Sequence, residues 1–92
     1  MIDEARRKRL IFRAKHMGSN ENDILFGGFA ERYLDNMSDD QILRFERLLK
    51  ESDADLFDWV TGKQPIPDAV NDEVMQLVLA FVQTTKKNAA LD

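Results

Sequence analysis

The residues best suited to chemistry lie in one short segment around Gly18. The segment holds the only histidine of the chain, His16, a hydroxyl at Ser19, and two carboxylates, Glu21 and Asp23. A histidine near a serine can support nucleophilic catalysis, and two carboxylates can act as acid and base. Gly18 interrupts the helix between His16 and Ser19, however, and acids at a helix start usually stabilise its dipole. The sequence therefore predicts no catalytic site and no enzyme.

Composition excludes several further classes of function. The chain has 92 residues, of which 43% are hydrophobic and 33% charged, which is typical of one globular domain spanning residues 1–92. Because the chain has no cysteine and only one histidine, no zinc site is expected. The absence of cysteine also fits a reducing compartment, and the bacterial cytoplasm is the expected location. The longest apolar run, 77–82, is far shorter than the roughly 20 residues of a membrane span, so no membrane insertion is expected.

Charge is distributed unevenly along the chain. Residues 1–18 carry six basic side chains against two acidic ones, and the rest carries seven against fifteen. A basic arm on an acidic body indicates a partner that is contacted at one end, although a solvated helix face has the same composition. The run from Arg6 to Arg9 also leaves open a small nucleic-acid-binding regulator that uses this arm.

Periodicity and capping signals predict an all-α fold, a five-helix bundle, because no segment alternates as a strand does. Asp3 is the expected cap of the first helix, Ser38 and Gln41 form a capping box, and Ser52 or Asp53 caps the fourth helix. The helices are expected at 3–17, 20–34, 38–51, 53–61 and 68–86, followed by a frayed tail at 88–92.

Two features of the predicted helices concern packing. Met17 continues the apolar stripe formed by Leu10 and Ala14, which predicts that its side chain packs inward. Gly27 and Gly28 lie inside the second helix, where each costs about 1 kcal/mol relative to alanine. They indicate either a close helix crossing or a surface that a partner approaches closely.

Several short motifs follow one another in the same order as in a known protein family. The motifs are Arg-Lys-Arg-Leu-Ile-Phe-Arg at 7–13, Gly18-x-x-Glu21 with Asp23, Ser-Asp-Asp at 38–40, Asp-Leu-Phe-Asp-Trp at 55–59 and Asn-Asp-Glu-Val-Met at 71–75. From residue 6 to about 84 the chain resembles the succinate dehydrogenase assembly factor 2 family, the SdhE flavinylation factors. The resemblance implies a five-helix protein that binds the flavoprotein subunit of succinate dehydrogenase and promotes covalent FAD attachment. Some bacterial members also serve fumarate reductase.

The hallmark of that family, Arg-Gly-x-x-Glu, is only partly present. Gly18 and Glu21 match, whereas Met17 takes the arginine position and brings none of the five donors of a guanidinium group. From the resemblance as a whole we expect a non-enzymatic assembly factor that binds no cofactor stably and acts on the FAD of its partner flavoprotein. A generic helical adaptor is a further alternative. The expected partner-binding residues are Arg13, His16, Met17, Gly18, Glu21 and Asp23.

Overall fold

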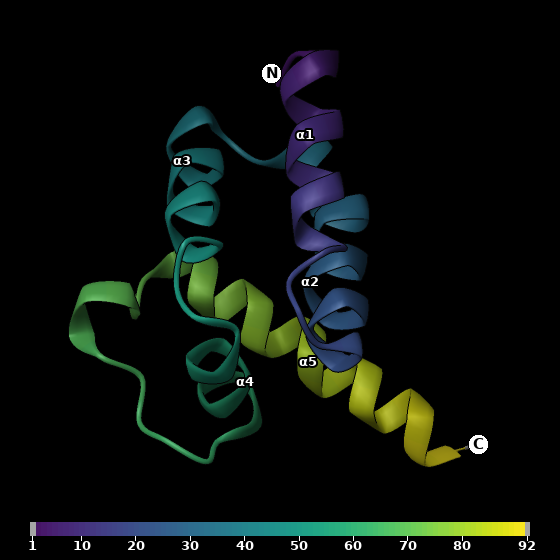
Figure 1. Ribbon diagram of the computed structural model, residues 1–92, viewed down its shortest axis with the longest axis vertical. Coiled ribbons are helices and arrows are strands. Elements are labelled where there is room, and N and C mark those ends of the chain that lie inside the picture. Colours follow the sequence, from purple (N-terminus) through teal and green to yellow (C-terminus); the bar gives the residue numbers. More distant parts are fainter. Residues whose placement is uncertain (1, 92) are drawn as a thin grey trace.

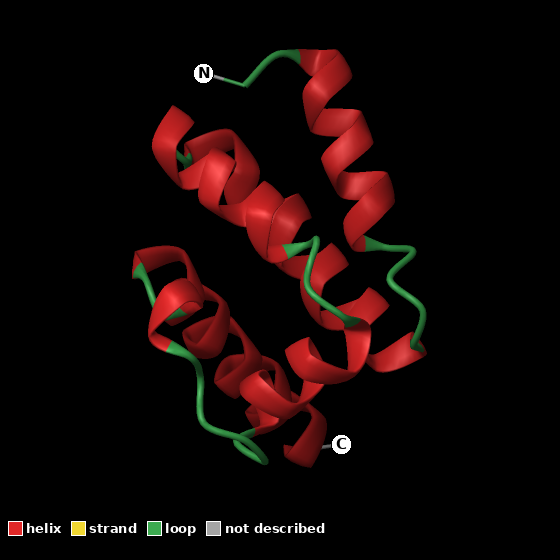
Figure 2. Ribbon diagram, turned by 60° about the vertical axis from the view of Figure 1, so that its left-hand side comes forward, coloured by secondary structure: helices red, strands yellow, loops and turns green. Residues whose placement is uncertain are grey.

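The second helix lies at the centre of the structure. The computed structural model describes residues 2–91, and the side chains of residues 2–85. Within this range there is no strand, so the expected all-α fold is confirmed (Figure 2). The α-helices are α1 (Glu4–Ala14), α2 (Asn20–Tyr33), α3 (Asp39–Leu48), α4 (Asp53–Thr61) and α5 (Glu73–Leu91), with short 3-10 turns at Leu34–Asn36 (η1) and Asp68–Val70 (η2). Helix α2 contacts α1, α4 and α5, and α5 runs diagonally from near the lower end of α3 towards the C-terminus at the lower right (Figure 1).

The core is built around one aromatic side chain of α2. Phe29 is fully buried, and its ring centroid lies 5.4 Å from that of Phe45 and 6.0 Å from that of Phe81. Tyr33 stacks on the same ring at 4.8 Å. Trp59 of α4 is also buried, three residues after the fully buried Leu56. Helices α2, α3 and α5 are therefore held together by aromatic contacts that no single helix could make alone.

The helix starts agree with the capping signals in the sequence. The Asp3 carboxylate accepts the backbone N–H of Arg6 at 2.9 Å, and Ser52 accepts that of Asp55 at 3.1 Å. Ser38 and Gln41 form the expected reciprocal capping box. These starts were predictable because each cap bonds only to residues three positions away.

Helix α1 ends three residues earlier than expected, at Ala14 rather than Met17. The backbone N–H of Met17 donates to Asp23 at 2.5 Å instead of to a helical carbonyl. Gly18 then adopts a φ of +125°, a conformation that L-residues rarely adopt. The expected break at Gly18 is real, but contacts with α2 unwind the chain before it.

The fifth helix begins at Glu73 rather than near Asp68. Asn71 has a non-helical ψ of 77°, and residues 68–70 form the separate turn η2. The Asp72 carboxylate accepts the N–H of Met75 at 3.0 Å, which makes Asp72 the cap of α5.

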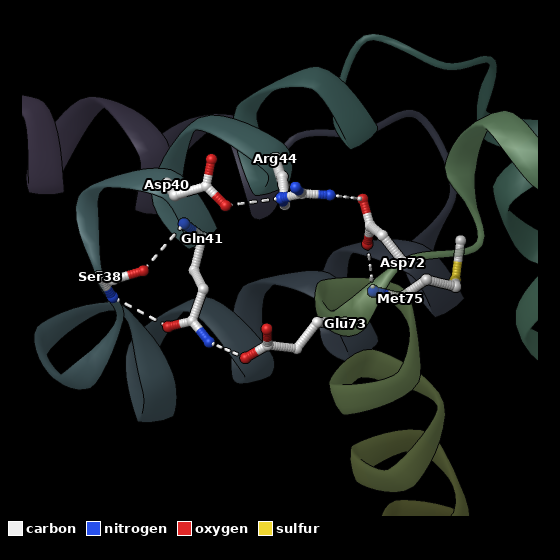
Figure 3. A network of polar contacts seen from close by, with 7 residues as sticks. All are labelled: Ser38, Asp40, Gln41, Arg44, Asp72, Glu73 and Met75. Atoms are coloured by element: carbon white, nitrogen blue, oxygen red, sulfur yellow. Dashed lines mark hydrogen bonds and ion pairs between the residues drawn. The ribbon is translucent and has the colours of Figure 1, made fainter.

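Polar contacts tie this start to α3 (Figure 3). Arg44 donates to Asp40 at 2.7 Å and to Asp72 at 3.4 Å, and the nearby carboxylates, Asp40 above all, raise the pKa of Arg44 above its ordinary value. Gln41 also donates to Glu73. The cap of α5 is therefore fixed from outside its own helix.

The other helix ends differ by a few residues. Helix α2 stops at Tyr33, where η1 tightens its last turn. Helix α3 stops at Leu48 rather than at residue 51, because Ser52 must be extended in order to cap α4. Helix α5 continues to Leu91, so the tail expected from residue 88 is wrong up to that point; alanine and leucine there favour a helix. Position 92 lies outside the described residues.

The glycine pair marks two close contacts. A Cβ added at Gly27 would lie 2.7 Å from Cγ of Lys15 and 3.5 Å from its Cα, so the chain leaving α1 crosses α2 directly over Gly27. A Cβ at Gly28 would lie 3.1 Å from Cζ of Phe81. A close crossing of segments therefore accounts for both glycines.

Truncating Phe29 tests this account of the core. Phe29→Ala should lower the free energy of unfolding by about 3–5 kcal/mol, because it removes a fully buried ring. Phe12→Ala is the matched control: Phe12 is 64% exposed, so its truncation should cost less than about 1 kcal/mol. Urea unfolding followed by circular dichroism measures both values. Equal losses in the two variants would contradict the assigned core.

Candidate functional site

The junction between α1 and α2 folds back onto α2. Asp23, in the first turn of α2, accepts the N–H of Met17 across six residues. The side chain of Met17 is half-buried and packs against the core, as its stripe position predicts. The hydroxyl of Ser19 caps α2 by accepting the N–H of Asn22 at 3.3 Å. Hydrogen bonds at both ends therefore hold Gly18 in its unusual conformation.

A buried amide fastens this junction to α4. Asn22 is fully buried, and its amide nitrogen donates to the carbonyl of Asp53 at 2.8 Å and to its carboxylate at 2.7 Å. Both groups on Asp53 are acceptors, so the amide nitrogen must face them, and the Asn22 carbonyl oxygen has no partner among the described residues. Gly18 lies close to this clamp. A Cβ added at Gly18 would lie 3.6 Å from Cγ of Asp53, which is an ordinary van der Waals contact. We call Asn22 and Asp53 the junction clamp.

Glu21 projects beside the junction clamp into solvent. Its side chain is exposed and makes no hydrogen bond or ion pair within the described part of the chain. It borders an apolar hollow of about 260 Å³ between α2 and α4. The other residues around this hollow are Ile24, Leu25, Phe57 and Thr61. A carboxylate next to an apolar hollow can bind a partner through an ion pair and a buried side chain together.

Arg13 and His16 belong to a different surface, an open groove of about 460 Å³ along α1. The groove is lined by Lys8, Arg9, Phe12, Arg13 and His16. His16 donates from Nδ1 to the Phe12 carbonyl at 2.6 Å, and its ring stacks on Phe12 with centroids 4.0 Å apart. Arg13 reaches the carbonyl of Leu49 at 3.5 Å.

The six expected residues are therefore not gathered at one point. Met17, Gly18 and Asp23 form the junction, Glu21 faces the hollow beside α4, and Arg13 and His16 face the α1 groove. The two surfaces share no lining residue.

The arrangement suits binding rather than catalysis. Nδ1 of His16 is engaged by a backbone carbonyl, and Ser19 faces Asp53 at 3.4 Å rather than His16. No cluster of three or more potential metal ligands occurs among the side chains that the structure describes. Across the same part of the chain, no helix is both long and apolar enough to traverse a bilayer.

The sequence analysis did not identify three residues of the junction clamp and the α1 groove. Asn22 resembles any polar residue in a first helical turn, and Asp53 was interpreted only as a candidate cap of α4. Phe12 could have been noticed, since it stands alone among basic residues and four positions before His16.

Comparisons with known proteins agree on one family. The sequence profile described as flavinator of succinate dehydrogenase matches residues 8–82. A zebrafish (Danio rerio) protein named succinate dehydrogenase assembly factor 2, mitochondrial, is 35% identical over 91 residues, which cover 97% of this chain and 58% of that protein. A protein of Acetobacter pasteurianus named FAD assembly factor SdhE is 45% identical over 64 residues, covering 70% of this chain and 59% of the relative. The chain thus spans somewhat more than half the length of these relatives.

Truncation of the buried amide tests the junction clamp. Asn22→Ala should lower the free energy of unfolding by about 1–3 kcal/mol, because it removes a fully buried amide together with its two part-buried hydrogen bonds to Asp53. Asn20→Ala, two residues earlier at an exposed position, should change stability by no more than about 0.5 kcal/mol. Chemical denaturation of both variants makes the comparison. A neutral Asn22→Ala would show that the junction does not depend on this contact.

Proposed function

The chain belongs to the Sdh5 family, the flavinators of succinate dehydrogenase, and from this premise we propose that it promotes covalent FAD attachment to the flavoprotein subunit of that enzyme. The match over residues 8–82 supports this assignment, as do relatives named for FAD assembly and for succinate dehydrogenase assembly. In this proposal the chain is an assembly factor and not an enzyme. It acts on the FAD of its partner and holds none of its own.

The observation that supports the proposal most directly is the exposed carboxylate of Glu21. Its carboxylate is solvent-exposed and has no partner among the described side chains, yet its backbone sits in the first turn of a helix whose start is pinned to α4. Because the backbone of Glu21 is already fixed, a partner that binds this carboxylate orders only its side chain, which limits the conformational entropy lost. We propose that Glu21 and Gly18 contact the flavoprotein directly, with Met17 and Asp23 shaping the contact.

The chemistry of flavinylation explains why a binding protein suffices. A histidine nitrogen of the flavoprotein becomes bonded to the 8α carbon of the flavin; one hydrogen is displaced from each atom, and the flavin ring itself accepts the two electrons. The helper must only favour the flavoprotein conformation in which the two atoms meet. Selective binding to that conformation raises its population by the difference in affinity between the two states.

The partner is proposed to be the isolated flavoprotein, before its other subunits bind. Fumarate reductase flavoprotein is a second partner of the same kind, as the family resemblance implies. The proposed location is the bacterial cytoplasm, in keeping with the cysteine-free composition.

Removing the free carboxylate tests the proposed contact. Glu21→Ala should strongly reduce covalent flavin while changing the free energy of unfolding by only about 0.3–1 kcal/mol, the value of one exposed charge near a helix N-terminus. Flavin fluorescence of the flavoprotein band in a denaturing gel measures the yield, in a strain that lacks its own assembly factor. Glu4→Ala is the matched control, because it removes an exposed acid from the first turn of α1. Equal yields from the two variants would remove Glu21 from the site.

Restoring the hallmark arginine tests the interpretation of Met17. Met17→Arg should raise the flavin yield in the same assay, because its aliphatic stem can keep the half-buried packing while the guanidinium reaches the partner. A variant that is less stable and no more active would show that Met17 serves packing alone.

A further inference from the structure

The basic residues of the N-terminal segment fall into two groups. Arg6, Arg7 and Lys15 each pair with a carboxylate from another part of the chain, namely Glu46, Asp35 and Glu31. These three charges are therefore used within the fold, where they attach α1 to the rest of the structure.

The cations of the α1 groove are not used in this way. Arg9 has no carboxylate partner in the described part of the chain, and Arg13 meets only a backbone carbonyl at 3.5 Å. Lys8 lies 3.8 Å from Glu4 on its own helix, and both side chains are about 70% exposed, with values of 74% and 69%. Such a contact is worth little, so the groove keeps a net positive charge.

The same groove exposes a large aromatic side chain. Phe12 is 64% exposed, the highest value among the large hydrophobic side chains that the structure describes. His16 covers one face of its ring and leaves the rest open. Within α1, residues 8 and 12 are spaced four apart, and so are 9 and 13, which places these four side chains on one face of the helix. His16, just beyond the helix, completes the lining of the groove. An aromatic anchor flanked by arginines is the usual composition of a binding hot spot.

From these observations we propose that the α1 groove binds an acidic segment of the flavoprotein that places an apolar side chain against Phe12. This inference rests on the proposed function and adds a second contact to it. Carboxylates of the segment pair with Arg9, Arg13 and Lys8, and its apolar residue fills the open side of the groove.

Charge favours a protein segment over nucleic acid as the occupant. The chain as a whole has a net charge of −4, so a long polyanion that leaves the groove meets an acidic body. A short acidic loop can contact the groove alone. The groove volume of about 460 Å³ also fits a few side chains rather than a tract of stacked bases.

The two surfaces should then differ in what they control. The α1 groove supplies affinity and salt dependence, because its charges attract the partner. Glu21, beside the pinned junction, supplies the selective contact. Loss of a groove contact should therefore be overcome by a higher concentration of this chain, whereas loss of Glu21 should not.

The first experiment measures binding of the purified chain to the isolated FAD-loaded flavoprotein subunit by calorimetry at low and physiological salt. Phe12→Ala should weaken binding roughly tenfold, and Arg9→Gln should weaken it roughly threefold to tenfold with a shallower salt dependence. Arg7→Gln is the matched control, since it removes the same charge from an ion-paired position of the same helix, and it should change the dissociation constant by less than about twofold. Saturating amounts of both groove variants should restore the full flavin yield.

Three results would overturn the inference, and each is distinct from failure of the proposed function. If the groove variants bind like the wild type, the flavoprotein does not bind at the α1 groove. A reduced flavin yield in Glu21→Ala would still support the proposed function in that case. A 20-nucleotide single-stranded poly-dT probe that binds tighter than the flavoprotein at physiological salt, and is lost with Phe12→Ala, would make the groove a nucleic-acid site. A flavin yield that stays low at saturation would assign the groove to the activating contact. If the wild-type chain does not bind the flavoprotein at all, the proposed function itself fails.

A second experiment identifies the segment. A photo-reactive phenylalanine analogue at position 12 should cross-link, on illumination of the complex, to a flavoprotein peptide that contains Asp or Glu next to an apolar residue. A cross-linked peptide of neutral or basic character would contradict the proposed chemistry of the partner.

Discussion

The buried amide of Asn22 is the contact on which the geometry of the junction depends. It joins the first turn of α2 to the first residue of α4 through two hydrogen bonds of 2.7 and 2.8 Å, and the Asn22 side chain is fully buried. Breaking these bonds is costly because the Asn22 amide is fully buried and would be left without a partner, although Asp53 itself is only half-buried. With the first turn of α2 attached to α4, the Gly18 segment that enters α2 lies beside Asp53, and Glu21 is presented on a rigid support.

Local signals in the sequence predicted the helix starts, because Asp3, Ser38 and Ser52 bond only to nearby backbone groups. The end of α1 was misplaced because the carboxylate of Asp23, six residues further along the chain, accepts the backbone N–H of Met17. The start of α5 was misplaced because residues 68–70 form a separate turn and Asp72, rather than Asp68, caps the helix. The candidate site was likewise predictable only where it depends on local sequence. Motif residues such as Glu21 could be named from their order, whereas the role of a buried amide depends on a partner 31 residues away.

The two surfaces on either side of the junction have opposite character. The α1 groove is basic and presents an exposed aromatic ring, and the hollow beside Glu21 is apolar with an acidic rim. They share the rigid junction between them, so one partner that contacts both must fit a fixed separation. Such a two-point contact would let a small protein distinguish one flavoprotein conformation from another, since only the matching conformation satisfies both points.

The most direct test of this account is hydrogen–deuterium exchange of the chain with and without the isolated flavoprotein subunit. Residues 8–24, which include the α1 groove and the junction, should become protected in the complex, while η2 and the exposed face of α3 should exchange as in the free protein. Protection confined to α3 and η2, with an unchanged junction, would contradict the central claim that the flavoprotein binds at the junction.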